Sequence, residues 1–192
     1  MSEPTARFRL IPQATAAAAL DTAGERLAAI GSQSIISTGE GNEADFGTID
    51  ISAGAANSGV LTMLWDITAD GGNALVENFK LWMSSNGFDQ AGSVCKFQPL
   101  SGADQASPSE TENYVADGVV GSYTWATLDE AEPAAQNVFP SDEGSSMALS
   151  TASDDAVMWA MHLAIASGET TGTYKGATEG YELQFSFKYA YS

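Results

Sequence analysis

The sequence predicts an all-β protein, an antiparallel β-sandwich or jelly roll of about seven to eight strands with an N-terminal arm. Two observations lead to this fold class. Apolar and aromatic residues recur at every second position in several segments, which is the period of a strand with one buried face. Clusters of Gly, Asn, Asp and Ser separate these segments, so a parallel sheet with alternating helices is not expected.

The strongest alternation lies in residues 181–191. The large side chains on one face of this segment are Tyr181, Leu183, Phe185, Phe187, Tyr189 and Tyr191. The residues between them are mostly polar. A helix would bring residues three and four positions apart onto one face, so this pattern predicts one long strand.

Residues 61–68 and 79–83 are two further alternating segments. The turn sequence Asp-Gly-Gly follows the first at 70–72, and the turn sequence Asn-Gly follows the second at 86–87. Strands bounded by such turns commonly pair with each other, so we predict a hairpin.

The remaining strand candidates are shorter or more ambiguous. They are residues 48–52, with Ile49 and Ile51 facing inward, and residues 93–98, 122–128 and 156–166. The last segment contains Ala and Met residues that would suit a buried helix, but its period of two favours a strand. Residues 100–113 and 129–155 are expected to be long loops.

Residues 1–39 differ from the rest of the chain, which we assign to a sandwich domain over residues 40–192. Residues 7–11 fit a short strand that Pro12 ends. The Ala-rich residues 14–30 fit either a short helix or an extended arm.

The chain has 25 acidic and 7 basic residues and a formal net charge of −18. Because nucleic-acid binding depends on Lys and Arg, a direct nucleic-acid partner is not expected. The charge is uneven, since residues 1–39 are neutral and residues 97–174 contain no Lys or Arg. We expect the neutral end to dock and the acidic block to face solvent.

No recognisable catalytic motif occurs, so we predict neither an enzyme nor a cofactor. The one histidine, His162, alternates with Ala160 and Ala164 in an apolar segment and is expected on the less buried face of a strand. Ser146 lacks the following glycine of a nucleophile elbow. The one cysteine, Cys95, cannot form an intrachain disulfide and suits a small buried apolar role, although Lys96 beside it would favour the thiolate.

Calcium is the metal that the acidic loops would suit, because it binds carboxylate and carbonyl oxygens. Acidic and amide residues cluster at 40–45, and Asp66, Asp70 and Asn73 flank a turn. Neither group follows the spacing of a calcium-binding loop, so no metal is predicted.

The sequence resembles virion structural proteins of tailed bacteriophages. The residues that carry the resemblance are the opening Arg7-Phe8-Arg9-Leu10-Ile11-Pro12, the segment 76–82 and the closing strand 181–191. Capsid decoration (cement) proteins and head-fibre bases are the most similar. The resemblance implies a β-rich module on the capsid surface, often a trimer, whose partners are the major capsid protein or other virion subunits.

Within such a module the arm is the expected contact with partners. Phe8, Leu10 and Ile11 would add a strand to a partner's sheet edge, and Arg7, Arg9 and Arg26 would pair with its acidic residues. The alternative is that residues 7–11 form the first strand of the chain's own sheet, with solvated arginines.

Two other functions stay open. One is a carbohydrate-binding sandwich, or a tail or fibre component used in host attachment, with Trp82 and Trp125 stacking on sugar rings. The other is a small hydrolase with a carboxylate pair, although a chain with so many acids always offers such pairs. No apolar run of about 18 residues and no signal-peptide pattern is present, so we expect synthesis in a host cytoplasm and no membrane contact.

Overall fold

The computed structural model describes residues 2–11, 35–36, 44–100, 125–140, 146–149, 157–172, 174–175 and 181–192. This part of the chain is all-β and contains no helix, which confirms the all-β part of the predicted fold class. The strands are β1 (Thr5–Ile11), β2 (Ile35–Ile36), β3 (Ala56–Asn57), β4 (Leu61–Ala69), β5 (Leu75–Asn86), β6 (Val94–Leu100), β7 (Ala126–Thr127), β8 (Ser146–Ala148), β9 (Val157–Ile165), β10 (Tyr174–Lys175) and β11 (Tyr181–Tyr191). The segment 14–30, predicted as a short helix or an extended arm, lies outside the described residues.

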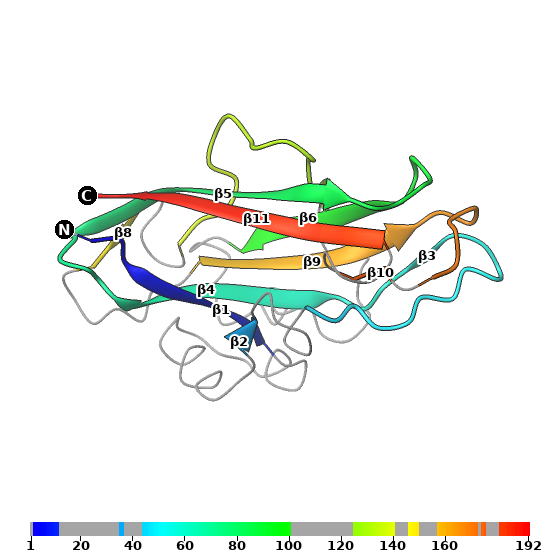
Figure 1. The fold of residues 1–192 in the computed structure, drawn as a ribbon, viewed down its shortest axis with the longest axis horizontal. Coiled ribbons are helices and arrows are strands. Elements are labelled where there is room, and N and C mark those ends of the chain that lie inside the picture. Colours follow the sequence, from blue (N-terminus) through cyan, green and yellow to red (C-terminus); the bar gives the residue numbers. More distant parts are fainter. Residues whose placement is uncertain are drawn as a thin grey trace, which may run out of the picture.

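The strands form two sheets. A seven-stranded sheet has the order β2-β1-β4-β9-β6-β7, with β3 also paired to β9, and a four-stranded sheet has the order β10-β11-β5-β8. Pairing is antiparallel except between β10 and β11. In Figure 1, β5 and β11 run along one layer and β4 and β9 along the other. The arm and the predicted sandwich domain share a sheet, because β1 and β2 both belong to the seven-stranded one.

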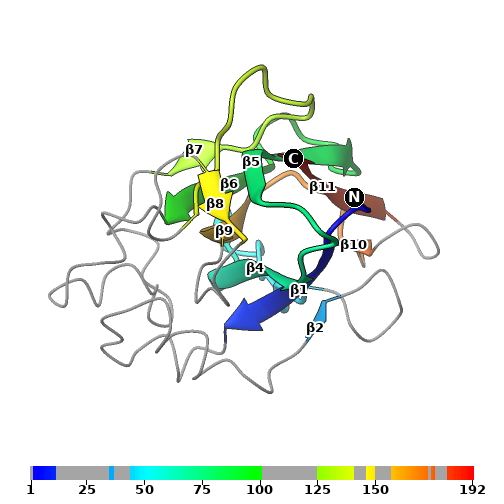
Figure 2. The ribbon, with the colours of Figure 1, turned by 90° about the vertical axis from the view of Figure 1, so that its left-hand side faces the viewer.

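Side chains from both sheets meet in one core. Trp159 of β9 stacks on Phe187 of β11 with ring centroids 5.6 Å apart, and Trp65 of β4 meets Phe79 of β5 edge-on at 5.7 Å. Figure 2, turned by 90°, shows the two sheets from their ends. Such aromatic contacts between sheets hold the layers together by burying large apolar surfaces.

The long strands lie where the alternation predicted them. β6, β9 and β11 correspond to the predicted segments 93–98, 156–166 and 181–191, and β9 is a strand rather than a helix. Within the predicted strand 122–128, Ala126–Thr127 form β7, and residues 122–124 lie outside the described part. Strand β8 falls in the expected loop 129–155, where a run of three residues is too short to show a period.

The predicted hairpin of 61–68 and 79–83 is wrong. β4 belongs to the seven-stranded sheet and β5 to the four-stranded sheet, so the chain crosses from one layer to the other between them. The physical reason is that both strands carry large apolar side chains, and the crossing places Trp65 and Phe79 on facing walls of the core.

The crossing turn is fixed at several points. The Asp70 carboxylate accepts a hydrogen bond from Gly72 N–H at 2.9 Å. The Gly71 carbonyl accepts one from Ser2 N–H at 3.0 Å, and the Ser192 carbonyl accepts one from Ala74 N–H at 2.8 Å. The turn therefore contacts both ends of the chain.

Residues 48–52 do not form the predicted strand. Asp45 and Asp50 accept hydrogen bonds from the N–H groups two residues later, both at 2.8 Å, which satisfies this backbone locally. The same kind of contact, from Ser52, holds the pKa of Asp50 below its usual value. Ile49 and Ile51 nevertheless pack against the core, as predicted.

Strand β9 is buried on both faces. Trp159 and Met161 point into the core between the sheets, while Met158, Ala160 and His162 alternate with them and are at most 2% exposed. The expectation that His162 lies on a less buried face is therefore wrong. Alternation indicates which face a side chain lies on, but it does not show what covers that face.

Candidate functional site

Two of the predicted arm arginines, Arg7 and Arg9, pair with a carboxylate of the same chain. Arg7 and Arg9 lie on the same side of β1, and both donate to the carboxylate of Asp66 on β4, with Nε to oxygen distances of 3.0 to 3.1 Å. Arg9 is 3% exposed and Asp66 is 6% exposed. The alternative of an internal first strand thus matches the structure, except that its arginines are paired with Asp66 rather than solvated.

The other arm residues also belong to this strand. β1 pairs with β4 along its whole length, from Thr5 opposite Ala69 to Ile11 opposite Thr62. The ring of Phe8 lies edge-on to Phe187 at 5.5 Å, across the core. Leu10 is opposite Met63 in the same register, and Arg26 lies outside the described residues.

The two tryptophans proposed to stack on sugars are not brought together. Trp82 of β5 is half-buried and alternates with the core residues Leu81 and Met83, so it faces away from the core on the four-stranded sheet. Trp125 lies edge-on to His162 of the seven-stranded sheet, with ring centroids 4.6 Å apart. They do not share one flat binding face.

Among the thiol and metal candidates, Cys95, Asp66 and Asp70 lie in the described part, whereas residues 40–43 lie outside it. Cys95 is fully buried, and burial raises the pKa of its thiol to about 12, which keeps it protonated. Asp66 binds two arginines, and Asp70 binds the turn backbone. Within the described ranges no group of three His, Cys, Asp or Glu side chains could hold a metal ion.

One edge of the four-stranded sheet is covered by the chain itself. β8 pairs with β5 at residues 75–77. Farther along, the Asn137 side chain accepts a hydrogen bond from Leu81 N–H and donates one to Leu81 C=O, both at 2.8 Å. The Asp129 carbonyl then accepts a bond from Met83 N–H at 2.9 Å. The segment 129–137 thus replaces a neighbouring strand.

The opposite edge of this sheet is formed by β11. On that side, β10 pairs with Tyr181 and Glu182 only. Among the described residues, no strand pairs with the outer side of residues 183–191, which we call the open edge. An unpaired strand edge is a template for pairing with another chain.

The backbone directions show which groups the open edge presents. In an antiparallel sheet, residues opposite each other point their N–H and C=O groups either both towards or both away from each other. Leu81 and Met83 direct theirs to the other side of β5, as their bonds to Asn137 and Asp129 show. Their partners Phe187 and Phe185 therefore direct their own groups towards the open edge.

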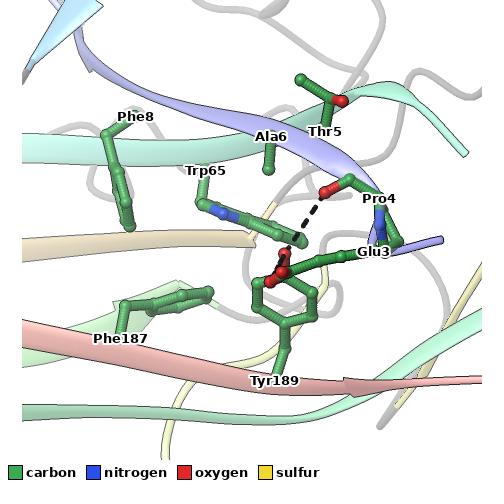
Figure 3. Close-up of a pocket in the computed structure, with 8 residues that line it drawn as sticks. All are labelled: Glu3, Pro4, Thr5, Ala6, Phe8, Trp65, Phe187 and Tyr189. Carbon is green, nitrogen blue, oxygen red and sulfur yellow. Dashed lines mark hydrogen bonds between the residues drawn. The ribbon is translucent and has the colours of Figure 1, made fainter. Parts of the chain in front are cut away.

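A cavity of about 470 Å³ lies beside the open edge, between β11 and the start of β1. Its aromatic lining residues are Phe8, Trp65, Phe187 and Tyr189, which we call the aromatic seam. Figure 3 shows Tyr189 reaching across from β11 to Glu3 and Pro4. Its hydroxyl lies 3.2 Å from Glu3 Oε1, and burial together with this carboxylate raises the pKa of Tyr189 to about 12.

Two lysines share one carboxylate near the middle of the outer face of β11. Lys188 lies directly opposite Lys80 of β5, which would be unfavourable for two like charges. Glu132 lies between them, at 2.9 Å from Lys188 Nζ and 3.3 Å from Lys80 Nζ. Hydrogen bonds from Lys188 and Lys80 hold the pKa of Glu132 below its usual value.

Two features were not predicted from the sequence. They are the pairing of Arg7 and Arg9 with Asp66, and the covering of the β5 edge by Asn137. A signal for the first was present, since Asp66 interrupts an apolar strand and a buried carboxylate needs a cationic partner. Nothing local marks Asn137 as the residue that covers Leu81, because the contact joins residues far apart in sequence.

Comparison with known proteins found no family model, curated protein or solved structure that matches this chain. None of the described residues form a helix long and apolar enough to cross a membrane.

Proposed function

We propose that this protein is a non-enzymatic structural subunit of a tailed-phage particle. It decorates the capsid surface, binds the major capsid protein or another virion subunit, and stabilises the shell. We class its two sheets as a β-sandwich, and we assign its synthesis to the host cytoplasm. The acidic block of residues 97–174 faces away from the shell in this proposal.

The observation that carries the proposal is the asymmetry of the four-stranded sheet. The chain covers the β5 edge with β8, Asn137 and Asp129, but leaves the edge of residues 183–191 without a strand among the described residues. Soluble monomers usually protect such edges. An edge left open beside an aromatic seam favours a protein that assembles with other subunits.

The arm plays a different part from the one that the sequence implied. Arg7 and Arg9 neutralise Asp66, and Phe8 packs on Phe187, so these groups are used inside the chain. We therefore place the subunit contacts on sheet edges instead of on residues 7–11.

Capsid binding tests the proposal. Empty capsids of a tailed phage, assembled from the major capsid protein, are mixed with the purified protein, sedimented and examined by calorimetry. We expect co-sedimentation and a higher capsid melting temperature. An unrelated protein of similar size and acidity is the control, since it matches the charge but lacks the fold. Failure to bind capsids, together with absence from purified virions by mass spectrometry, would overturn the proposal.

A further inference from the structure

We propose that the open edge of β11 pairs with the same edge of a second copy of this chain. The two β11 strands run antiparallel about a two-fold axis at Phe187, which joins two four-stranded sheets into one continuous sheet. The inference deepens the proposed function by naming a subunit contact, and it rests on that function only for its use in a particle.

The backbone meets the requirement for this pairing. Phe185 and Phe187 direct their N–H and C=O groups outward, because their partners Met83 and Leu81 direct theirs to the other side of β5. At the end of β11, Ser192 and Leu75 exchange both of their backbone hydrogen bonds at 3.1 Å, so the N–H and C=O of Tyr191 next to Ser192 point outward as well. Alternate residues from 183 to 191 therefore present donors and acceptors to a second strand.

The register follows from the extent of the free stretch. Because β10 occupies Tyr181 and Glu182, a second strand has residues 183–191 available. An antiparallel pair that uses this whole stretch is centred on Phe187. It places Phe187 opposite its own copy, where outward-pointing groups meet outward-pointing groups and every hydrogen bond of the ladder forms.

The side chains in this register match on both faces. On the inner face Leu183 meets Tyr191 and Phe185 meets Tyr189, so apolar groups meet apolar groups. Tyr191 is 44% exposed in the single chain and is the large hydrophobic residue left exposed in the described part. Contact with Leu183 of a second copy would cover it.

Charge favours a second copy at this edge. Residues 183–191 contain no acidic residue, in a chain whose net charge is −18. In the proposed register the outer-face pairs are Gln184 with Ala190 and Ser186 with Lys188, so no like charges are opposed. Lys188 shares the carboxylate of Glu132 with Lys80 and keeps part of its positive charge exposed. Two otherwise strongly acidic chains can therefore approach here without direct repulsion.

Sedimentation velocity on the purified full-length chain tests the contact. At about 100 µM we expect a species of twice the 20.0 kDa chain mass. A monomer at this concentration would overturn the inference, and so would a trimer, because a two-fold pairing closes at two copies. The trimer that the phage resemblance implies and the dimer proposed here are therefore distinguished by this measurement.

Opposite charges at one position test the register. Ser186→Lys places one lysine opposite Lys188 of the other copy in each of the two symmetric pairs, which should weaken the dimer about three- to tenfold. Ser186→Glu should strengthen it by a similar factor. Ala126→Lys adds the same charge on the exposed strand β7 of the other sheet and should leave dimerisation unchanged. Circular dichroism checks that each variant folds.

A disulfide provides a second test that does not depend on affinity. In this register residue 184 of one copy lies opposite residue 190 of the other. A chain that carries both Gln184→Cys and Ala190→Cys should therefore form disulfides with a second copy under oxidising conditions. A dimer that forms no cross-link and responds equally to both Ser186 variants would overturn the β11 contact. Capsid binding is measured separately, so failure of this contact and failure of the proposed function are distinguishable.

Discussion

Asp66 of β4 accepts a hydrogen bond from Arg9 of β1 at 3.0 Å, in a place where Arg9 is only 3% exposed. The same carboxylate binds Arg7, whose side chain is 36% exposed. Two cations thus share one anion on the outer face of the seven-stranded sheet. This contact ties the first strand of the chain to β4 and accounts for two of its seven basic residues.

Replacing Asp66 by Asn should lower the free energy of unfolding by about 3–5 kcal/mol, because it leaves the buried Arg9 without its counter-charge. Arg7→Ala should cost about 1 kcal/mol or less, since its guanidinium is partly solvated. Urea unfolding followed by tryptophan fluorescence measures both. Similar losses for the two variants would show that burial does not set the strength of these pairs.

Asn137→Ala should lower the free energy of unfolding by about 1–3 kcal/mol, because Leu81 loses hydrogen bonds to both its N–H and its C=O. Hydrogen exchange of the Leu81 amide should become faster. Asn57→Ala, at an exposed position of β3, is the matched control and should change neither quantity appreciably. Unchanged exchange at Leu81 would mean that Asn137 does not protect the β5 edge.

Gly71→Ala should destabilise the protein by about 1–3 kcal/mol. Gly71 has φ +65°, and a Cβ built there would lie 2.5 Å from the carbonyl oxygen of Ser2. Gly59 has no atom within 4 Å of such a Cβ, so Gly59→Ala should stay within about 1 kcal/mol of the parent. Thermal unfolding compares the two variants, and equal effects would contradict this account of the turn.

Stability should fall as the pH drops below about 6.5, the unperturbed pKa of histidine. Burial is the main cause that lowers the pKa of His162, and the charge of Lys96 opposite it adds to this effect. The unfolded chain therefore takes up a proton on His162 at a higher pH than the folded chain does. Asp50, Asp89 and Glu132, whose pKa values are also lowered, lose their contributions only at more acidic pH.

Two measurements check this behaviour of His162. Because the chain has one histidine, its NMR titration is read without overlap and should give a pKa below 6.5. His162→Gln should remove the stability change between pH 7 and about pH 5.5. A normal titration midpoint would show that the ring is solvated despite its contact with Trp125.

Alternation predicted much of the fold because it reports a local property, namely which way successive side chains point. It predicted the positions of β9 and β11 and the inward direction of Ile49 and Ile51. It failed on the β4 and β5 hairpin, since two strands with apolar faces satisfy the pattern equally well side by side in one sheet or facing each other across a core.

The sequence was sufficient to predict the all-β class, the positions of the long strands and a small buried apolar role for Cys95, whereas the burial that keeps its thiol protonated is a tertiary property. The tertiary structure alone decided that Arg9 meets Asp66, that Asn137 covers one edge of the four-stranded sheet, and that the other edge is left to β11. These outcomes depend on pairing between residues far apart in the chain. Such pairing is set by how two sheets bury a common core, which no short stretch of sequence encodes.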